Sequence, residues 1–337
     1  RLTGVGPEQV AIIDGDVFSR PLAADAPPAP ADVNTWALPG WVVARKPESA
    51  QRAMWQCVFD SDYSPPNPSR DGRAWFRSPW IAAPNAESAK KWQIDGKRDY
   101  RFDGAGPTLL VWDAKKPILD SYPYNQRPGV PNGTFPVSDT RMSLAIKPDA
   151  PGQRVAAVWV TRGHEFRAEI TGSEVMLKMR PISNAENGPW KTIGNSAMSA
   201  PIQSGVFTNL DFWHADQALS VFVNEKRIAH GEYDWTPAER IQFSLGLSLD
   251  QVFSEKDNLL ARRERYVQCQ PRLEFDGGAF TLSHTALYRD IHYQAGNYQP
   301  LADGTPSVPA GAPHSRANQP SASTHPRQPH YLAEGEY

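Results

Sequence analysis

Apolar and polar residues follow two different periods along this chain. Between residues 47 and 58 apolar side chains recur every three to four positions, which predicts one early helix with Pro47 in its first turn. From about residue 99 the pattern is typical of short strands. The expected strands cover residues 100–102, 108–112, 142–146, 155–160, 166–170, 175–179, 206–228 (two strands and the start of a third), 241–247 and 280–293.

Turn residues separate these segments and define their pairing. Thr171-Gly172-Ser173-Glu174 predicts a hairpin, and further turns are expected at residues 215–217 and 224–225. Ten or so short strands with one or two short helices predict a mainly β fold, an antiparallel β-sandwich or jelly roll. Its buried positions are expected to include Val158, Trp159, Leu210, Phe212, Leu219, Val221, Phe243, Leu245 and Leu282.

One segment of the predicted strands resembles a sequence pattern of the concanavalin-like and laminin-G-like sandwiches. It reads Asp216-Gln217-Ala218-Leu219-Ser220-Val221-Phe222-Val223-Asn224-Glu225-Lys226, with Glu225 where those proteins usually have glycine. A left-handed turn position costs a non-glycine residue roughly 1 kcal/mol. The resemblance implies the fold and does not imply sugar binding, because many non-binders share this fold.

Composition divides the chain further. Residues 23–34 are a Pro/Ala linker, and residues 294–330 are a Pro-rich segment that we expect to be disordered. The block 35–293 between them reads as an inserted domain, flanked by residues 1–22 and by a return segment at 331–337. We expect those two end segments to lie together as β-structure, apart from the sandwich.

The overall charge excludes some partners. The 337 residues carry 35 Lys+Arg against 37 Asp+Glu, so no basic excess indicates nucleic acid. Apolar runs are too short to span a bilayer. The two cysteines, Cys57 and Cys269, are either one disulfide or two buried thiols.

The two ends carry a second resemblance. The chain opens on Arg1-Leu2-Thr3-Gly4-Val5-Gly6-Pro7-Glu8 and continues to Ile12-Ile13-Asp14-Gly15-Asp16-Val17, and it stops on Tyr331-Leu332-Ala333-Glu334-Gly335-Glu336-Tyr337. The first stretch resembles the segment after the catalytic lysine of bacterial signal peptidase I, although the family's Pro-Gly is here Gly6-Pro7. The last stretch resembles the lead-in to that family's final conserved box.

That resemblance implies a function. The chain would be part of a serine–lysine leader peptidase that cleaves signal peptides from exported preproteins, with the inserted sandwich as an extra domain. The serine and the lysine would both lie outside the chain, so this fragment alone would be inactive. Arg1 matches a family arginine that supports the active site. The resemblance also implies the extracytoplasmic, periplasmic face of the cell membrane, an anchor outside the chain, and no cofactor.

Other candidate chemistry is sparse. Oxygen atoms of Asp211, Asp216 and Asn224, with His214 beside them, could form a Ca²⁺ or sugar site, or could be ordinary polar residues at the rim of a sandwich. The histidine and cysteine spacings do not match a zinc site, and we expect no metal. Two functions besides the peptidase stay open. One is an extracytoplasmic lectin-like module that binds carbohydrate or protein without catalysis, and the other is a structural insertion.

Overall fold

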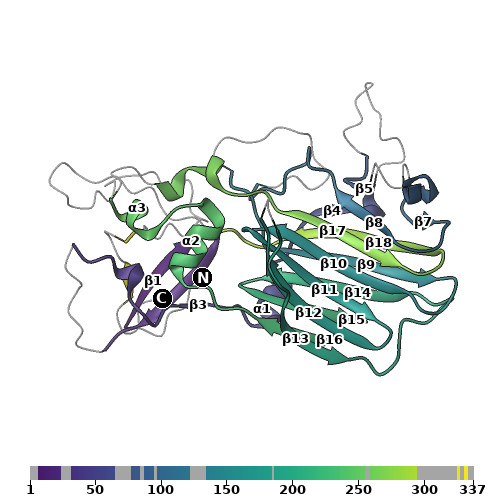
Figure 1. Ribbon diagram of the computed structural model, residues 1–337, viewed down its shortest axis with the longest axis horizontal. Helices are drawn as coiled ribbons and strands as arrows, with labels where there is room; N and C mark the ends of the chain where they lie inside the picture. The colour runs from purple at the N-terminus through teal and green to yellow at the C-terminus, as the bar shows by residue number, and fades with distance from the viewer. Residues whose placement is uncertain are drawn as a thin grey trace. The chain divides into compact units, whose positions relative to one another are not determined.

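The computed structural model describes residues 7–23, 32–64, 77–83, 87–94, 97–121, 134–183, 186–254, 259–293, 325–326 and 330–332. The fold is mainly antiparallel β-structure, as predicted, and the described residues form three α-helices where one or two were expected (Figure 1). The chain divides into two units. Unit 1 comprises Arg1–Pro47, Asp234–Val267 and Ile291–Tyr337, and unit 2 comprises Glu48–Tyr233 and Gln268–Asp290.

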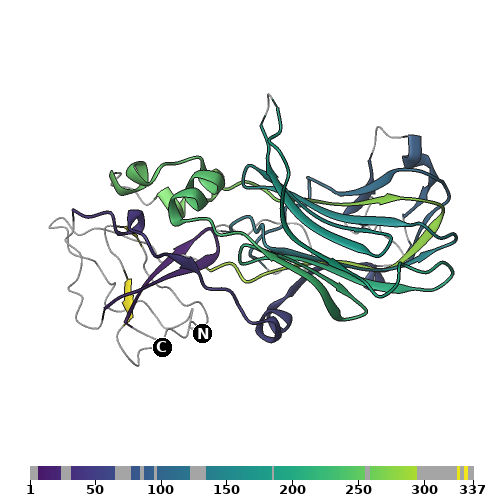
Figure 2. The same cartoon turned by 60° about the horizontal axis from the view of Figure 1, so that its bottom comes forward.

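Unit 2 is a sandwich of two antiparallel sheets, which Figure 2 shows as two layers of curved strands. The seven-stranded sheet has the order β13 (Lys191–Ala197), β12 (Glu174–Pro181), β11 (His164–Thr171), β10 (Arg154–Thr161), β17 (Gln270–Asp276), β8 (Thr108–Trp112), β5 (Trp80–Ala82). The eight-stranded sheet has the order β16 (Lys226–Glu232), β15 (Ala218–Val223), β14 (Thr208–Ala215), β9 (Thr140–Pro148), β18 (Phe280–Arg289), β7 (Tyr100–Phe102), β6 (Trp92–Gln93), with β4 (Gln56–Asp60) also paired to β18.

Aromatic side chains join the inner faces of the two sheets. The rings of Phe166 on β11 and His214 on β14 lie 4.4 Å apart, and those of Phe275 on β17 and Phe280 on β18 lie 4.7 Å apart. Trp159 on β10 also donates a hydrogen bond from Nε1 across the core. Burial of this apolar surface is the main force that holds the layers together.

Most of the positions expected to be buried are confirmed. Val158, Trp159, Leu210, Phe212, Leu219, Val221 and Leu282 are almost completely buried, and Leu245 is buried in unit 1. Phe243 is only partly buried.

The predicted hairpin turns are confirmed. Asp216 and Gln217 both have positive φ, and so do Asn224 and Glu225, with φ of 48° and 69° for the second pair. Two successive left-handed residues are the geometry of a two-residue hairpin turn whose twist matches the strands. Glu225 therefore occupies the left-handed position where the related sandwiches have glycine, at a cost of roughly 1 kcal/mol.

Two facing glycines let the sheets approach each other at one edge of the sandwich. β13 ends one sheet and β16 ends the other. A Cβ atom on Gly194 would lie 2.7 Å from the carbonyl oxygen of His230, and one on Gly231 would lie 2.6 Å from that of Ile193. Both distances are shorter than a carbon–oxygen contact allows, so neither position accepts a side chain without movement of the backbone.

The predicted early helix is confirmed as α1 (Glu48–Met54), but it is shorter than expected. Cys57 and Val58, which fit the helical period, belong instead to β4. Short 3₁₀ turns in unit 2 are η2 (Ser61–Tyr63) and η4 (Glu87–Lys91).

Unit 1 contains a four-stranded antiparallel sheet and two helices. The sheet has the order β19 (His330–Leu332), β1 (Glu8–Ile13), β2 (Asp16–Pro21), β3 (Val42–Val43). Pairing of β1 with β19 confirms, for the described residues, that the two end segments lie together. The other elements are α2 (Pro237–Leu245), α3 (Leu249–Ser254), η1 (Thr35–Ala37), η5 (Leu259–Ala261) and η6 (Arg263–Arg265).

The prediction of a strand at residues 241–247 is wrong, because this segment lies largely in α2. Thr236 caps the helix by accepting a hydrogen bond from the backbone N–H of Glu239, and the Glu239 carboxylate binds the Thr236 N–H in return. Pro237 fills the first turn, and Gly246 ends the helix in the left-handed conformation. A capping box, an N-terminal proline and a C-terminal glycine outweigh an apolar alternation of only four residues.

A buried ion-pair cluster fixes α2 on the β1–β2 hairpin within unit 1. The side chain of Arg240 has no exposed surface, and it lies 3.1 Å from a carboxylate oxygen of Asp14 and 2.8 Å from one of Asp16. Ser244, one turn later, donates a hydrogen bond to Asp14 at 2.7 Å. Removing Arg240 would take a cation away from two buried carboxylates, and breaking a buried ion pair typically costs about 3–5 kcal/mol.

The predicted linkers lie mostly outside the described residues, and the boundaries of the inserted domain stay predictions. The structure does assign residues 35–47 and 234–267 of the predicted block to unit 1. In the described part of the chain, no helix has the length and apolar character that a bilayer crossing requires.

Candidate functional site

Charged side chains cover the outer face of the seven-stranded sheet, and alternation along the strands places them there. On β11, Phe166, Ala168 and Ile170 point into the core and are fully buried. Their neighbours Glu165, Arg167 and Glu169 therefore point to the opposite side. The register adds Lys178 and Arg180 of β12 to the same face, opposite Arg167 and Glu165 respectively. Arg154 of β10 and the outward residues of β17 extend it across the sheet.

These residues form one continuous series of ion pairs, which we call the ion-pair chain. Arg180 binds Glu165, which also binds Arg272 at 2.5 Å. Arg272 also binds Glu274 at 2.7 Å. Arg167 binds Glu274 at 2.5 Å and Glu169 at 2.9 Å, so it connects these two carboxylates. Arg154 then connects Glu169 with Asp276, the second contact at 3.8 Å. The members in order are Arg180, Glu165, Arg272, Glu274, Arg167, Glu169, Arg154 and Asp276.

The ion-pair chain lies on an apolar floor. Val158 and Ala156 of β10 are on the outer face, yet Val158 has no exposed surface and Ala156 has almost none. Val158 pairs directly with Arg167 on one side and with Arg272 on the other. The aliphatic stems of these arginines cover the floor while their guanidinium groups reach the carboxylates. The polar groups of this face are therefore held in position by packing as well as by charge.

An exposed tryptophan lies at one end of the ion-pair chain. Trp190 keeps 38 % of its surface exposed. The guanidinium carbon of Arg180 lies 4.3 Å from the ring centroid, and Nζ of Lys178 lies 5.1 Å from it. Cations over the face of an indole are attracted to its π electrons. These two contacts cover part of the ring and orient it, and the exposed part of Trp190 is an aromatic platform beside the ion-paired groups.

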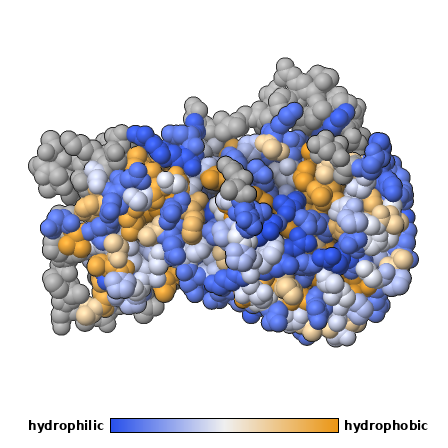
Figure 3. Space-filling view, viewed as in Figure 1, coloured by the Kyte–Doolittle hydropathy of each residue, from blue (hydrophilic) through white to orange (hydrophobic). Residues whose placement is uncertain are grey.

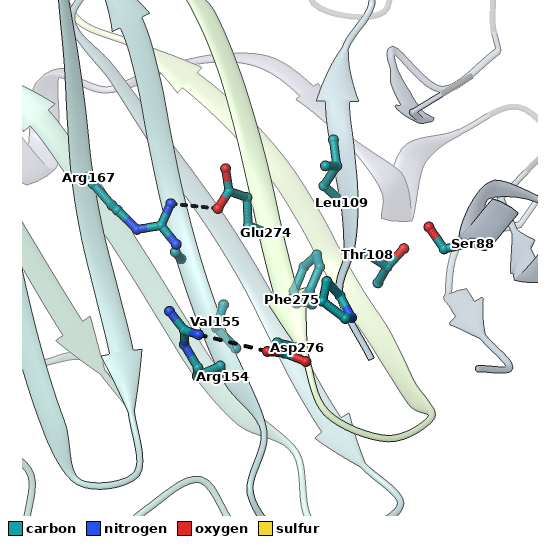
Figure 4. Close-up of a pocket in the computed structure, with 11 residues that line it drawn as sticks. Ser88, Thr108, Leu109, Arg154, Val155, Arg167, Glu274, Phe275 and Asp276 are labelled. Atoms are coloured by element: carbon teal, nitrogen blue, oxygen red, sulfur yellow. Dashed lines mark hydrogen bonds and ion pairs between the residues drawn. The ribbon is translucent and has the colours of Figure 1, made fainter. Parts of the chain in front are cut away.

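A hollow of about 250 Å³ lies at the other end of the ion-pair chain (Figure 4). Figure 4 shows Thr108 and Leu109 on β8 and Ser88 on η4 on one side of it, with the paired Arg154–Asp276 and Arg167–Glu274 on the other. The Ser88 hydroxyl and the guanidinium and carboxylate groups border the hollow, whereas the buried Thr108 hydroxyl accepts a hydrogen bond from Nε1 of Trp92. The lining residues are Ser88, Pro107, Thr108, Leu109, Arg154, Val155, Ala156, Arg167, Glu274, Phe275 and Asp276.

The arginines keep two carboxylates of this face, Glu169 and Glu274, ionised. Burial disfavours the charged form of Glu169, but hydrogen bonds from Arg167 and Arg154 outweigh that effect and lower its pKa to about 2. The pKa of Glu274 is also lowered, because hydrogen bonds and charge from Arg272 and Arg167 outweigh its burial. At neutral pH both groups are therefore ionised, so they accept hydrogen bonds and do not donate them.

The outer face of the eight-stranded sheet is built differently, because α1 covers part of it. Arg52 of α1 lies over the rings of Trp213 at 5.0 Å and Phe222 at 4.5 Å, and it donates a hydrogen bond to the backbone oxygen of Glu225. Trp55 packs edge-on against Trp213 with ring centroids 5.5 Å apart. Trp213 is consequently only 5 % exposed. This covered face offers a ligand little accessible surface around its aromatic side chains.

A serine, a histidine and a glutamate are also connected on that second face. Ser220 and Nδ1 of His230 lie 2.8 Å apart, and Nε2 of His230 lies 2.9 Å from Glu232. This order matches that of a nucleophile, a base and an orienting carboxylate. However, β15 pairs with a strand on each side, so the backbone N–H groups around Ser220 are committed to the sheet and form no oxyanion hole. We assign the three residues to cross-strand pairing of β15 with β16.

The structure does not bring the four site residues predicted from the sequence together. Asp211 faces outward and forms a 2.6 Å ion pair with Arg141. His214 points into the core with no exposed surface, where its ring nitrogens lie 2.8 Å from the hydroxyl of Tyr233 and 3.3 Å from the carbonyl of Ser138.

The other two predicted residues lie at opposite ends of β15. Asp216 is in the turn before this strand, where its N–H donates to Asp139. Asn224 is in the turn after it, where its side chain accepts a hydrogen bond from the N–H of Asn209. Six strand residues separate the two turns, which corresponds to about 20 Å. Arg1, the residue expected to support a peptidase active site, lies outside the described residues.

Both cysteines are free thiols. Burial raises the pKa of Cys57 and of Cys269 to about 12. The alternative of one disulfide between them is therefore wrong, and neither thiol is ionised to act as a nucleophile near neutral pH.

Comparisons with known proteins find the fold but no sequence family. No family model matches the chain, and no curated protein matches it in sequence. Among solved structures, it is similar to the carbohydrate-binding module CBM66 from Bacillus subtilis, with a TM-score of 0.33 and 11 % identity over 63 % of this chain and 96 % of that one. It is also similar to β-agarase A in complex with oligoagarose, with a TM-score of 0.39 and 9 % identity over 70 % and 92 %.

A third similar structure is a Bacillus subtilis protein of unknown function with a galectin-like fold, with a TM-score of 0.36 and 7 % identity over 70 % of this chain and 98 % of that one. None of these structures resembles a signal peptidase. The two antiparallel sheets of unit 2 define a β-sandwich, as the sequence predicted.

The prediction that this chain is part of signal peptidase I is therefore wrong, together with its expected signal-peptide partners. The similar folds are carbohydrate-binding modules, galectins and glycoside hydrolases. Turn chemistry accounts for the central part of the misleading opening motif. Asp14 and Gly15 have φ of 49° and 83°, so Ile13-Asp14-Gly15-Asp16 is an Asp-Gly hairpin that occurs in many folds. The extracytoplasmic location stays a prediction.

The charged face does have a local signal in the sequence. Glu165-Phe166-Arg167-Ala168-Glu169 alternates charged and apolar residues without a break. Such a strand has one buried face and one fully charged face. Its partners Arg272 and Glu274 lie more than a hundred residues later, so the ion-pair chain itself has no local signature. Trp190 follows Gly188 and Pro189, which are typical of a loop.

Proposed function

We propose that unit 2 is a lectin-like module that binds carbohydrate, without cleaving it, on the outer face of its seven-stranded sheet. The observation that carries this proposal is Trp190. It is an exposed indole ring, oriented by Arg180 and Lys178, at the end of a row of ordered hydrogen-bonding groups. A sugar ring has one apolar C–H face that can stack on an indole, and a rim of hydroxyl groups that both donate and accept hydrogen bonds.

The ordering of this face lowers the cost of binding. Each immobilised long side chain typically costs about 0.5–1.5 kcal/mol on association. Here the ion pairs already hold the arginines and glutamates in the free protein, for example Arg167 between Glu274 and Glu169. A ligand hydroxyl that meets one of these pairs finds a donor and an acceptor side by side. This arrangement suits a polyol.

Charge balance favours an uncharged sugar over a polyanion. The cations of the face are Arg154, Arg167, Lys178, Arg180 and Arg272, and the carboxylates in contact with them are Glu165, Glu169, Glu274 and Asp276. The two charges therefore nearly cancel. Figure 3 shows that hydrophilic residues predominate on the side of the sandwich it presents, with only small hydrophobic areas among them.

The lowered pKa values of two carboxylates on this face support binding without hydrolysis. Glycoside hydrolysis by a carboxylate pair requires one group that holds a proton near neutral pH, which means a raised pKa. On this face the pKa values of Glu169 and Glu274 are lowered instead. These two groups can accept hydrogen bonds from hydroxyl groups, but neither can act as the general acid.

Native affinity electrophoresis tests the proposal. The chain is run through gels that contain β-1,3-glucan, β-1,4-glucan, β-1,4-galactan or agarose, beside a gel without polysaccharide. We expect retardation in at least one gel, and we expect Trp190→Ala to abolish it. Phe207→Ala is the matched control, because Phe207 is a similarly exposed aromatic residue, in contact with Lys147, on another part of the sandwich. An unretarded wild-type chain in every gel, or unchanged retardation of Trp190→Ala, would overturn the proposal.

A further inference from the structure

Trp190 and the hollow lie apart on the charged face, and the distance between them determines how long a ligand must be to contact both. Trp190 lies beside Arg180. Arg180 pairs with Glu165 on the next strand and Glu165 pairs with Val160, so these three residues form one row across the sheet. The hollow is centred four residues further along, in the row of Glu169, Ala156 and Glu274, and it extends to Leu109. Two distinct features, an aromatic platform and a concavity, therefore occupy the two ends of one face.

The sheet geometry gives the distance between them. From β12 to β17 the face crosses three strand intervals of about 4.8 Å, or about 14 Å. Four residues along a strand add about 14 Å in the perpendicular direction. The diagonal from the platform to the hollow is thus about 20 Å. One sugar unit within a chain is about as long as one strand interval, so a disaccharide on Trp190 does not reach the hollow.

The surface between the two features is continuous and ordered. The ion-pair chain runs from Arg180 at the platform to Arg154 and Asp276 at the hollow, with each carboxylate held by at least one arginine. Its members point outward from neighbouring strands, so they present donors and acceptors along the whole diagonal. A ligand that follows this path gains contacts with each additional unit.

We infer that the face takes an internal stretch of a neutral oligosaccharide, about four or more sugar units long, laid diagonally across the strands from Trp190 to the hollow. This inference rests on the proposed function and names the ligand class of the same site. The reducing and non-reducing ends of the bound stretch lie beyond the face, so recognition does not depend on a chain terminus. The hollow is the second anchor and adds affinity only for ligands long enough to reach it.

A length series tests the inference. Oligosaccharides of two, four and six units, prepared from whichever of the four polysaccharides retards the chain, are titrated calorimetrically into the whole protein. We expect the affinity to rise at least about tenfold from two units to six, which is a difference of about 1.4 kcal/mol. Hydrogen exchange should slow in β8 and η4 on binding of the hexasaccharide and not on binding of the disaccharide.

Two substitutions locate the second anchor. Ser88→Tyr fills the hollow without removing a member of the ion-pair chain, and we expect it to weaken hexasaccharide binding at least about fivefold while disaccharide binding is unchanged. Lys90→Tyr is the control, because Lys90 lies on the same η4 turn with 78 % of its side chain exposed and does not line the hollow. Trp190→Ala should weaken both ligands.

The outcomes separate this inference from the proposed function. Equal affinity for two and six units, or hexasaccharide binding that Ser88→Tyr leaves unchanged with no exchange protection in β8, would overturn the extended site while the lectin-like function stands. If none of the four polysaccharides retards the wild-type chain, the proposed function fails and the extended site fails with it.

Discussion

The two outer faces of the sandwich use arginine and tryptophan in opposite ways. On the seven-stranded sheet the arginines pair with carboxylates on a charged face, and Trp190 is exposed beside them. On the eight-stranded sheet Arg52 of α1 lies over Trp213 and Phe222 and closes the aromatic surface. The same contact, a guanidinium over an indole, presents one ring to solvent and buries the other. The difference lies in whether a further element covers the pair.

The largest expected effect concerns the covered face. Trp213→Ala should lower the free energy of unfolding by about 3–5 kcal/mol, because it removes a buried ring that packs against Trp55 and Phe222. Trp190→Ala should change the free energy of unfolding by less than about 1 kcal/mol, because its ring is 38 % exposed. Urea unfolding of both variants measures the contrast. Similar stability losses in the two would mean that the faces do not differ as described.

A second test removes the carboxylate that joins the largest number of cations. Glu169→Gln leaves Arg154, Arg167 and Lys178 each without one partner, although Arg167 keeps Glu274. We expect a loss of about 1–3 kcal/mol in the free energy of unfolding, since a largely buried acceptor of charged donors is weakened. Asp211→Asn, which disturbs the single 2.6 Å pair with Arg141 on the covered face, is the comparison. A larger loss from Asp211→Asn would contradict the importance of the ion-pair chain.

The ion-pair chain also predicts a pH dependence. The pKa of Glu169 is about 2 in the folded protein against an ordinary value of 4.5, so the folded state binds its proton more weakly than the unfolded state does. Its stabilising contribution is complete above pH 4.5 and is lost as the pH falls toward 2. Urea midpoints between pH 7 and pH 2.5 should therefore fall less steeply for Glu169→Gln than for the wild type. Parallel curves would mean that Glu169 is not held ionised by its arginines.

The smallest effect is expected for the Ser220–His230–Glu232 series. His230→Ala removes two hydrogen bonds from a partly exposed side chain. Exposed pairs of this kind contribute about 0.2–1 kcal/mol. Thermal unfolding should change by only a few degrees, and the variant should keep wild-type retardation in the polysaccharide gels. Loss of retardation would move the ligand site to the eight-stranded sheet.

Local signals predicted the parts of this fold that local chemistry determines. The turns at residues 171–174, 215–217 and 224–225 and the helix after Pro47 are confirmed because turn and cap residues act within four positions. The strand predicted at residues 241–247 failed for the same kind of reason, since Thr236 and Glu239 define a helix start that the apolar alternation did not outweigh. The ends of the chain misled because an Asp-Gly hairpin identifies a turn and not a family.

The candidate site could not be predicted from local sequence signals. Whether Glu165 meets Arg272 depends on β10 lying between β11 and β17, a pairing over more than a hundred residues. The candidate ligands predicted from the sequence were polar residues of a single hairpin, whereas His214 of that hairpin is a core residue. Alternation does identify which residues share a face, but only the order of strands identifies which faces become one surface.

The close approach of β13 and β16 has a consequence for how this protein behaves at high concentration. A terminal strand of a sheet normally exposes unpaired N–H and C=O groups that can recruit a strand from another molecule. Here Gly194 and Gly231 allow the two terminal strands to lie against each other, backbone to backbone. Each strand thereby restricts access to the other along one side of the sandwich. A valine at either glycine would separate the layers there. We expect such a variant to aggregate at high concentration even if each molecule still folds.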